Sequence, residues 1–156
     1  MELETGHFAP DFTLETDNSG EFSLSAQKGK QNVVLYFYPK DDTPGCTIEA
    51  NDFTKLQDDF DRAGTLILGI SRDDLASHGK FREKHCLSFP LGYDETGSVC
   101  DAYGTWIEKN MYGKKYMGIQ RDTFLIGKDG KIANVWRKVK VEGHAQEVLE
   151  AARKLK

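Results

Sequence analysis

The sequence predicts an α/β protein with a central mixed sheet, flanking helices and an N-terminal β-hairpin extension. Two short apolar stretches, "NVVLYFY" at 32–38 and "TLILGIS" at 65–71, have the composition of strands buried on both faces. Helical patterns alternate with these strands, which favours a parallel core. With 38% hydrophobic and 29% charged residues, the 156-residue chain reads as a single globular domain, 1–156.

Local patterns define the elements of the first half. "DFTLETDNSGEFSL" alternates apolar and polar residues around a turn at 18–20, which predicts a hairpin. The strand at 32–38 follows. A helix is expected from Thr43 to about Ala63, because apolar residues recur at helical spacing and Gly64 ends the pattern.

After the strand at 65–71, a helix is expected over 75–85 and a short one over 98–103. The next segment contains Trp106, Tyr112, Tyr116 and Met117 and is interpreted as an apolar loop. "RDTFLIGKDGKIANVWR" predicts a late antiparallel hairpin that turns at 128–131. The last helix carries one apolar stripe, made of Val148, Leu149, Ala152 and Leu155.

Charge and cysteine content exclude several classes of function. The net charge of −4 disfavours nucleic acid or an anionic membrane surface as a partner. No apolar run approaches the roughly 20 residues that span a bilayer, and the N-terminus lacks a secretory pattern, so a cytoplasmic location is expected. The three cysteines argue against a secreted disulfide framework, and any disulfide is expected to be transient and catalytic.

The stretch "PKDDTPGCT" places a cysteine where a helix begins. With Thr43 as N-cap, Pro44 and Gly45 are the first helical residues and Cys46 lies in the first turn. Free backbone N–H groups and the positive end of the helix dipole favour a thiolate there. A buried structural cysteine needs no such preceding residues, so we interpret Cys46 as reactive.

These residues resemble the peroxiredoxins, whose Pro-x-x-x-Thr-x-x-Cys signature matches Pro39, Thr43 and Cys46. "YFYPKDDTPGCTIEA" is similar to the bacterioferritin comigratory protein branch, also called peroxiredoxin Q. "GHFAPDFTL", "SFPLGYDE", "KNMYGKKYMGIQRDTFLI" and "WRKVKVEGHAQEVL" resemble it too, so the likeness covers nearly the whole chain. It implies a thioredoxin-like fold and a thiol peroxidase for hydrogen peroxide and organic hydroperoxides, without metal, haem or flavin, and a monomer.

The resemblance also implies roles for individual residues. Cys46 matches the peroxidatic cysteine, which peroxide oxidises to a sulfenic acid. Thr43 and Arg121 match the residues that hydrogen-bond the peroxide and the thiolate, and Pro39 matches the proline that shields the sulfur. A permanent guanidinium charge suits this role, since it stabilises both the thiolate and charge developing along the O–O bond.

The sequence is compatible with more than one source of the thiol that regenerates Cys46. Many members of this branch have a resolving cysteine five residues after the first, where this chain has Asn51; others have it at the position of Arg82. Cys86 comes one helical turn after Arg82 and is the favoured resolving residue. An external thiol (thioredoxin, glutaredoxin or glutathione) and Cys100 are the alternatives, although Cys100 fits a packed core cysteine better. A Cys46–Cys86 disulfide would require local unfolding near 43–51.

Three other functions compete with the peroxidase interpretation. A thioredoxin-type oxidoreductase needs Cys-x-x-Cys, and Cys46-Thr47-Ile48-Glu49 lacks the second cysteine. A peroxide sensor that relays Cys46 oxidation to a partner uses the same chemistry and stays open. A cysteine hydrolase is disfavoured because no local pattern ties a histidine to Cys46. The apolar loop before Arg121 could form a wall of the peroxide pocket or a docking surface for a reductant.

Overall fold

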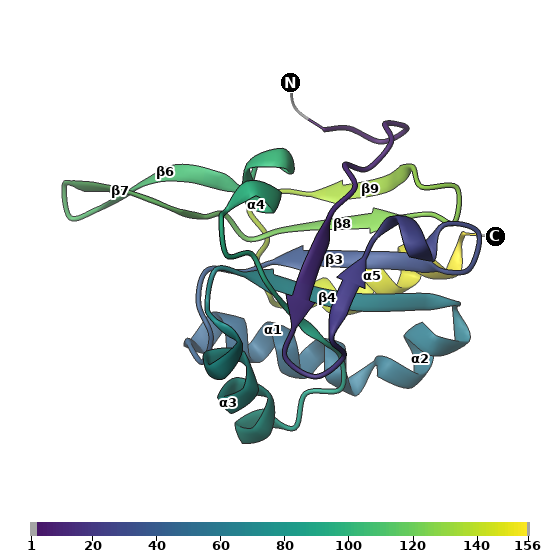
Figure 1. The fold of residues 1–156 in the computed structure, drawn as a ribbon, viewed down its shortest axis with the longest axis horizontal. Helices are drawn as coiled ribbons and strands as arrows, with labels where there is room; N and C mark the ends of the chain where they lie inside the picture. Colours follow the sequence, from purple (N-terminus) through teal and green to yellow (C-terminus); the bar gives the residue numbers. More distant parts are fainter. Residues whose placement is uncertain (1–2, 156) are drawn as a thin grey trace.

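A seven-stranded mixed sheet in the order β2-β1-β5-β4-β3-β8-β9 forms the centre of the molecule (Figure 1). The structure is a computed structural model that describes residues 3–155. The strands of this sheet are β1 (Thr13–Thr16), β2 (Glu21–Ser23), β3 (Asn32–Phe37), β4 (Thr65–Ser71), β5 (Leu91–Tyr93), β8 (Asp122–Ile126) and β9 (Ile132–Trp136). A separate two-stranded hairpin consists of β6 (Trp106–Met111) and β7 (Lys114–Ile119).

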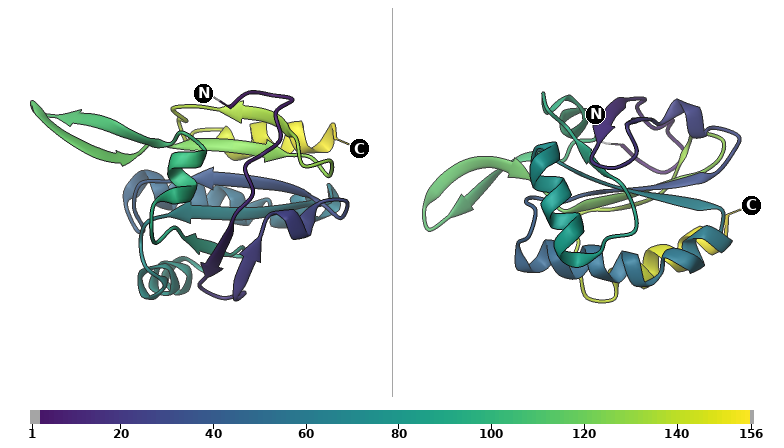
Figure 2. Two further views of the ribbon diagram at one scale, coloured as in Figure 1. Left: turned by 45° about the horizontal axis from the view of Figure 1, so that its top comes forward. Right: turned by 60° about the horizontal axis from the view of Figure 1, so that its bottom comes forward.

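Helices cover the sheet on both sides. They are α1 (Pro44–Lys55), α2 (Gln57–Arg62), α3 (Leu75–His85), α4 (Ser98–Ala102) and α5 (His144–Arg153), with a short 3₁₀ helix at Ser25–Gln27. Figure 2 shows α1, α2 and α5 together on one face, while the N-terminal segment and α4 lie on the other. The predicted fold class, a thioredoxin-like mixed sheet with an N-terminal hairpin, is confirmed.

The strand register determines where the site lies. β3 runs parallel to β4 and antiparallel to β8, with Phe37 opposite Asp122. The end of β3 therefore lies next to the beginning of β8. The loop that follows β3 and the residue that precedes β8 meet at this edge of the sheet, although they are far apart in sequence.

Each face of the sheet has its own hydrophobic core. The core under α1, α2, α3 and α5 includes Tyr36, Phe53, Phe81 and Leu149. The core on the opposite face includes Phe37, Phe124 and Ile119, with Trp106 packed against it. Successive β3 side chains point into these two cores in turn, which is why the strand is buried throughout and is apolar after Asn32.

The secondary structure differs from the sequence-based prediction in three places. The expected helix over 43–63 is two helices, because Leu56 leaves the helical conformation between α1 and α2. The expected apolar loop before Arg121 is the β6–β7 hairpin, turning at Tyr112 and Gly113. The strand β5 was missed; its three residues, one of them glycine, are too short for a pattern, and pairing with β4 defines it.

Candidate active site

Cys46 lies in the first turn of α1, near the edge where β3 ends. Thr43 is the N-cap residue with an extended backbone (φ −89°, ψ 157°), and Pro44 begins the helix, as predicted. The Cys46 side chain is buried, and the cysteine is not in a disulfide. The first N–H groups of a helix have no intrahelical acceptor, so this position favours an anionic sulfur.

Arg121 lies directly before β8, and its guanidinium reaches the sulfur. Its Nη2 donates to the Sγ of Cys46 at 3.3 Å, and its Nη1 donates to Oε1 of Glu49 at 2.7 Å. A Cβ at Gly45 would lie 3.1 Å from Nη2, so glycine leaves the space in which the guanidinium lies. The structure thus brings together Cys46 and Arg121, the two residues to which the resemblance gave the central roles.

Glu49 is a buried carboxyl group that sequence reasoning missed. Burial raises its pKa to about 7, although the Arg121 guanidinium acts in the opposite direction. Within residues 3–155, its second oxygen, Oε2, has no hydrogen-bond partner. Burial also opposes the charge on Arg121, but Glu49 and Cys46 together keep the pKa of Arg121 above its ordinary value. The sequence signal that could have identified Glu49 is its spacing: it follows Cys46 by three residues and therefore lies on the same face of α1.

Thr43 and Pro39 lie on the loop that leads to Cys46. The Thr43 hydroxyl donates to the carbonyl oxygen of Lys40 at 2.8 Å, so its proton is engaged in the loop while its lone pairs can still accept. Pro39 follows the buried Tyr38 and is exposed. The roles of these two residues toward peroxide and sulfur remain predictions.

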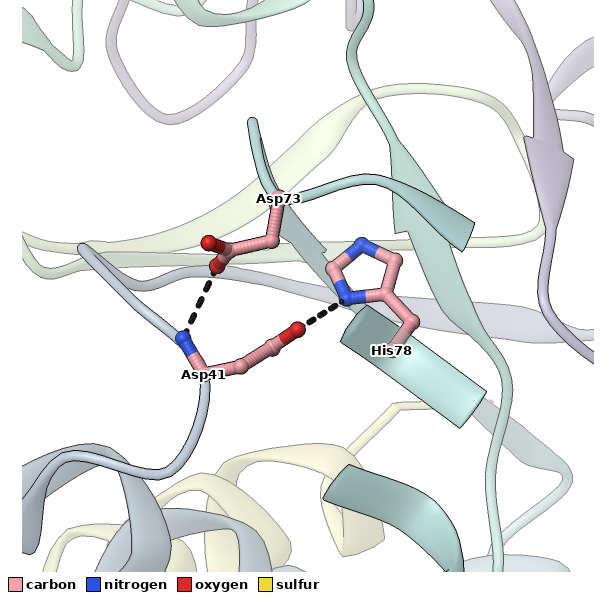
Figure 3. A group of neighbouring side chains, drawn as sticks. All are labelled: Asp41, Asp73 and His78. Carbon is pink, nitrogen blue, oxygen red and sulfur yellow. Dashed lines mark hydrogen bonds and ion pairs between the residues drawn. The ribbon is translucent and has the colours of Figure 1, made fainter. Parts of the chain in front are cut away.

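A buried network holds this loop against α3. The Asp41 carboxylate accepts from Tyr38 at 2.6 Å and from Ser77 at 2.8 Å, and it contacts Nδ1 of His78 at 2.8 Å. The N–H of Asp41 donates to Asp73 at 2.8 Å (Figure 3). The position of the residues just before Cys46 is therefore determined by α3 and by the end of β4.

The residues Asp41, Asp73 and His78 each offer an atom that could bind a metal ion, and these atoms lie within 4.8 Å of one another. Each residue already makes hydrogen bonds within the protein: Asp73 also accepts from Ser71, and the other ring nitrogen of His78 contacts the carbonyl of Gly92. We therefore interpret the group as an anchor of the loop.

Asp42 links the same loop to the other end of α3. Its carboxylate accepts from Lys84 at 2.8 Å and contacts His85 at 2.9 Å. Hydrogen bonds from these two residues hold the pKa of Asp42 below its ordinary value. The loop before Cys46 thus contacts the residues just before Cys86, which brings the two cysteine-bearing segments side by side.

Cys86 lies at the C-terminal end of α3. α3 ends at His85, and Cys86 is its C-cap with a left-handed backbone (φ 52°), exposed and not in a disulfide. Arg82 fixes the adjacent turn: it pairs with both oxygens of Asp17 and donates to the carbonyl oxygens of Leu87 and Phe89. The Cys86 N–H still donates to the carbonyl oxygen of Arg82, one helical turn earlier, but its left-handed backbone ends the helix there. The role of Cys86 as resolving residue stays a prediction.

Cys100 is a packed core cysteine. It lies in α4, its side chain is fully buried, and its N–H donates to Asp94 at 2.8 Å. Burial, followed by the Asp94 carboxylate, raises the pKa of the Cys100 thiol far above its ordinary value. Such a thiol is a poor nucleophile, which favours the structural interpretation made from the sequence.

A thioredoxin-like fold that presents a helix-start cysteine to an arginine defines a cysteine-dependent peroxidase of the peroxiredoxin class. The AhpC/TSA family model matches residues 5–135, and the chain belongs to this family. It is 47% identical over 150 residues to peroxiredoxin Bcp of Bacillus subtilis, covering 96% of this chain and 95% of the relative.

Solved structures agree with this assignment. Bacterioferritin comigratory protein of Xanthomonas campestris, studied for its alkyl peroxide reduction activity, superposes with a TM-score of 0.88 at 45% identity, covering 97% of this chain and 96% of that one. Peroxidoxin BcpB of Mycobacterium tuberculosis superposes with a TM-score of 0.87 at 32% identity, covering 99% of both chains. The protein is a thiol-dependent peroxidase of the Bcp type.

Among the described residues, no helix has the length and apolarity needed to cross a lipid bilayer.

Proposed function

We propose that Cys46 is the peroxidatic cysteine and that it reduces hydrogen peroxide and organic hydroperoxides. The hydrogen bond from Arg121 to the Cys46 sulfur, at a helix start, is the observation that carries the proposal. The thiolate attacks the terminal peroxide oxygen, an S–O bond forms as the O–O bond breaks, and Cys46 becomes a sulfenic acid. The departing hydroxide or alkoxide takes a proton from solvent.

Arg121 and Thr43 complete the peroxide site in this proposal. The Arg121 guanidinium stabilises the thiolate and the charge that develops on the peroxide oxygens. The Thr43 hydroxyl donates its hydrogen bond to the backbone carbonyl oxygen of Lys40, which supports a role as acceptor from the hydroperoxide O–H. Pro39 shields the sulfur once peroxide has entered.

We propose that Cys86 resolves the sulfenic acid, forming a Cys46–Cys86 disulfide with release of water. The contacts of Asp42 with Lys84 and His85 support this assignment, because they bring the two segments together. Arg82 holds the turn around Cys86, so the first turn of α1 is the part that unwinds. A thioredoxin, glutaredoxin or glutathione then reduces the disulfide, or reduces the sulfenic acid directly if Cys86 takes no part.

Turnover with dithiothreitol as reductant tests the proposal. Cys46→Ser should abolish catalytic peroxide loss, and Cys100→Ser should retain it. Consumption of only one equivalent of peroxide per Cys46 would instead identify a peroxide sensor. Peptide mapping of peroxide-treated protein without reductant tests Cys86: no Cys46–Cys86 link at any time would leave only the external thiol.

We also propose a cytoplasmic monomer formed by one domain, residues 1–156. Three unpaired cysteines are typical of proteins in a reducing compartment. Light scattering coupled to size exclusion tests the monomer, and cell fractionation tests the compartment.

A further inference from the structure

The β6–β7 hairpin carries an unusual share of exposed apolar side chains. In residues 3–155, six large hydrophobic side chains are exposed. One is Ile48, two residues after Cys46; another, Phe8, lies elsewhere; the rest belong to the hairpin: Met111, Tyr112, Tyr116 and Met117. Exposed apolar side chains gathered in one region mark an interaction site, and methionine and tyrosine are common at such sites.

The hairpin extends away from the body of the molecule (Figure 1). It begins at Trp106 and leads back to Ile119, two residues before Arg121. Two strands without a further covering layer are marginally stable in water. The hairpin thus presents an extended surface that starts at the active site.

One face of the hairpin lies on the side of Cys46. Trp106 and Ile119, which are paired, pack into the core opposite α1, so the other face points toward the α1 side. That second face consists of three cross-strand pairs: Ile107 with Gly118, Lys109 with Tyr116, and Met111 with Lys114. We call it the pocket-side face.

Lys109 is the residue of the pocket-side face whose pKa responds to the charges of Arg121 and Cys46. Its stem passes 3.3 Å from the position of a Cβ on Gly118, so the side chain runs toward the base of the hairpin. Burial lowers the pKa of Lys109, as does the Arg121 charge, while the Cys46 sulfur acts in the opposite direction. The ammonium group therefore lies within the electrostatic field of the active site.

The charges on this face indicate its partner. The pocket-side face has two lysines, Lys109 and Lys114, and no carboxylate, whereas the chain as a whole has a net charge of −4. Two copies would bring like charges together, and lysines on exposed strands also oppose edge-to-edge pairing. An acidic partner with an apolar contact surface fits better.

We propose that the pocket-side face, together with Ile48, is the docking surface for an acidic protein that carries the reducing dithiol. This inference rests on the proposed peroxidase cycle. The dithiol supplies two electrons: the partner is oxidised to its disulfide, and Cys46 sulfenic acid returns to the thiol with release of water. If the Cys46–Cys86 disulfide has formed, the same two electrons return both cysteines to thiols.

Adjacent residues provide matched variants. Lys114 lies on the pocket-side face and Lys115 on the opposite one; Tyr116 (43% exposed) and Met117 (50% exposed) are divided in the same way. The reductant is an acidic thioredoxin, kept reduced by its reductase, and dithiothreitol is used in parallel. Lys114→Glu and Tyr116→Ser should raise KM for the thioredoxin about 5–10-fold, as for loss of an interface contact. Lys115→Glu, Met117→Ser and Phe8→Ser should stay within about twofold.

Comparing thioredoxin with dithiothreitol shows whether the docking surface or the peroxidase cycle is at fault. All variants should turn over with dithiothreitol at the wild-type rate. Equal effects on both faces, or a wild-type protein reduced by dithiothreitol but not by the thioredoxin, would overturn the docking surface alone. Loss of a dimer in Lys114→Glu or Tyr116→Ser would show that a second copy occupies it. Failure of the wild type with dithiothreitol would overturn the peroxidase cycle itself.

Discussion

The Arg121 guanidinium donates one hydrogen bond to the Cys46 sulfur and another to the buried carboxyl group of Glu49. We expect Arg121→Gln to slow sulfenic acid formation about 100-fold, a typical cost of losing a preorganised donor at a developing charge. Arg121→Lys should be impaired less, because it keeps the charge but cannot bridge Cys46 and Glu49. Stopped-flow measurement of the second-order rate with peroxide checks this order; equal rates for Lys and wild type would contradict the bridging role.

Glu49 should make the free energy of unfolding fall as pH rises, which is the opposite of the effect of a carboxylate whose pKa is lowered by folding. Its pKa is raised from 4.5 to about 7 in the folded protein. Between these values the folded state keeps a proton that the unfolded chain has released, so the free energy of unfolding falls as pH rises and levels off above about 7.

The isosteric Glu49→Gln variant should lack this contribution. Denaturant unfolding from pH 4 to 8, compared between variant and wild type, removes the effect of other titrating groups. The variant should gain stability relative to the wild type as pH rises through the interval. A difference that does not change with pH would show that Glu49 does not titrate there.

The turn after α3 depends on Arg82. Its partner Asp17 is buried, with 1% of its side chain exposed. Arg82→Met leaves that carboxylate without its ion-pair partner, which costs about 3–5 kcal/mol of unfolding free energy in comparable cases. We also expect faster amide hydrogen exchange in residues 86–89, because two carbonyls of this segment lose their donor.

Arg62→Met is the matched control. Arg62 also pairs with an aspartate, Asp59, but its side chain is 76% exposed. Such a surface pair contributes about 0–1 kcal/mol, so stability and exchange at 86–89 should hardly change. Equal effects of the two substitutions would argue against a special role of Arg82 in holding the Cys86 turn.

Elements with a buried apolar pattern were predictable, and the exposed hairpin was not. β3 and β4 are mostly apolar and almost entirely buried, and β4 and α3 have the predicted bounds. β6 and β7 are mostly half-buried or exposed and rich in lysine, so neither alternation nor a continuous apolar run marks them. The two strands pair across the turn at Tyr112 and Gly113. One glycine in the sequence is too weak a signal to predict that turn.

Across the whole molecule, the sequence indicated which residues to expect at the candidate site but not what surrounds them. Cys46 was predictable because a local pattern, Thr-Pro-Gly before a helix, determines its environment. Arg121 needed the family resemblance, since 75 residues separate it from Cys46. Asp41 and His78 were not predicted, because their partners come together only through the packing of α3 on the sheet.

The most direct test of the Cys46 assignment is to trap the sulfenic acid with dimedone after one equivalent of peroxide and to map the adduct by mass spectrometry. We predict that the adduct forms on Cys46 and that Cys86→Ser, which cannot resolve it, accumulates more. The buried Cys100 should stay unlabelled. Labelling of Cys86 or Cys100 in place of Cys46 would contradict the account.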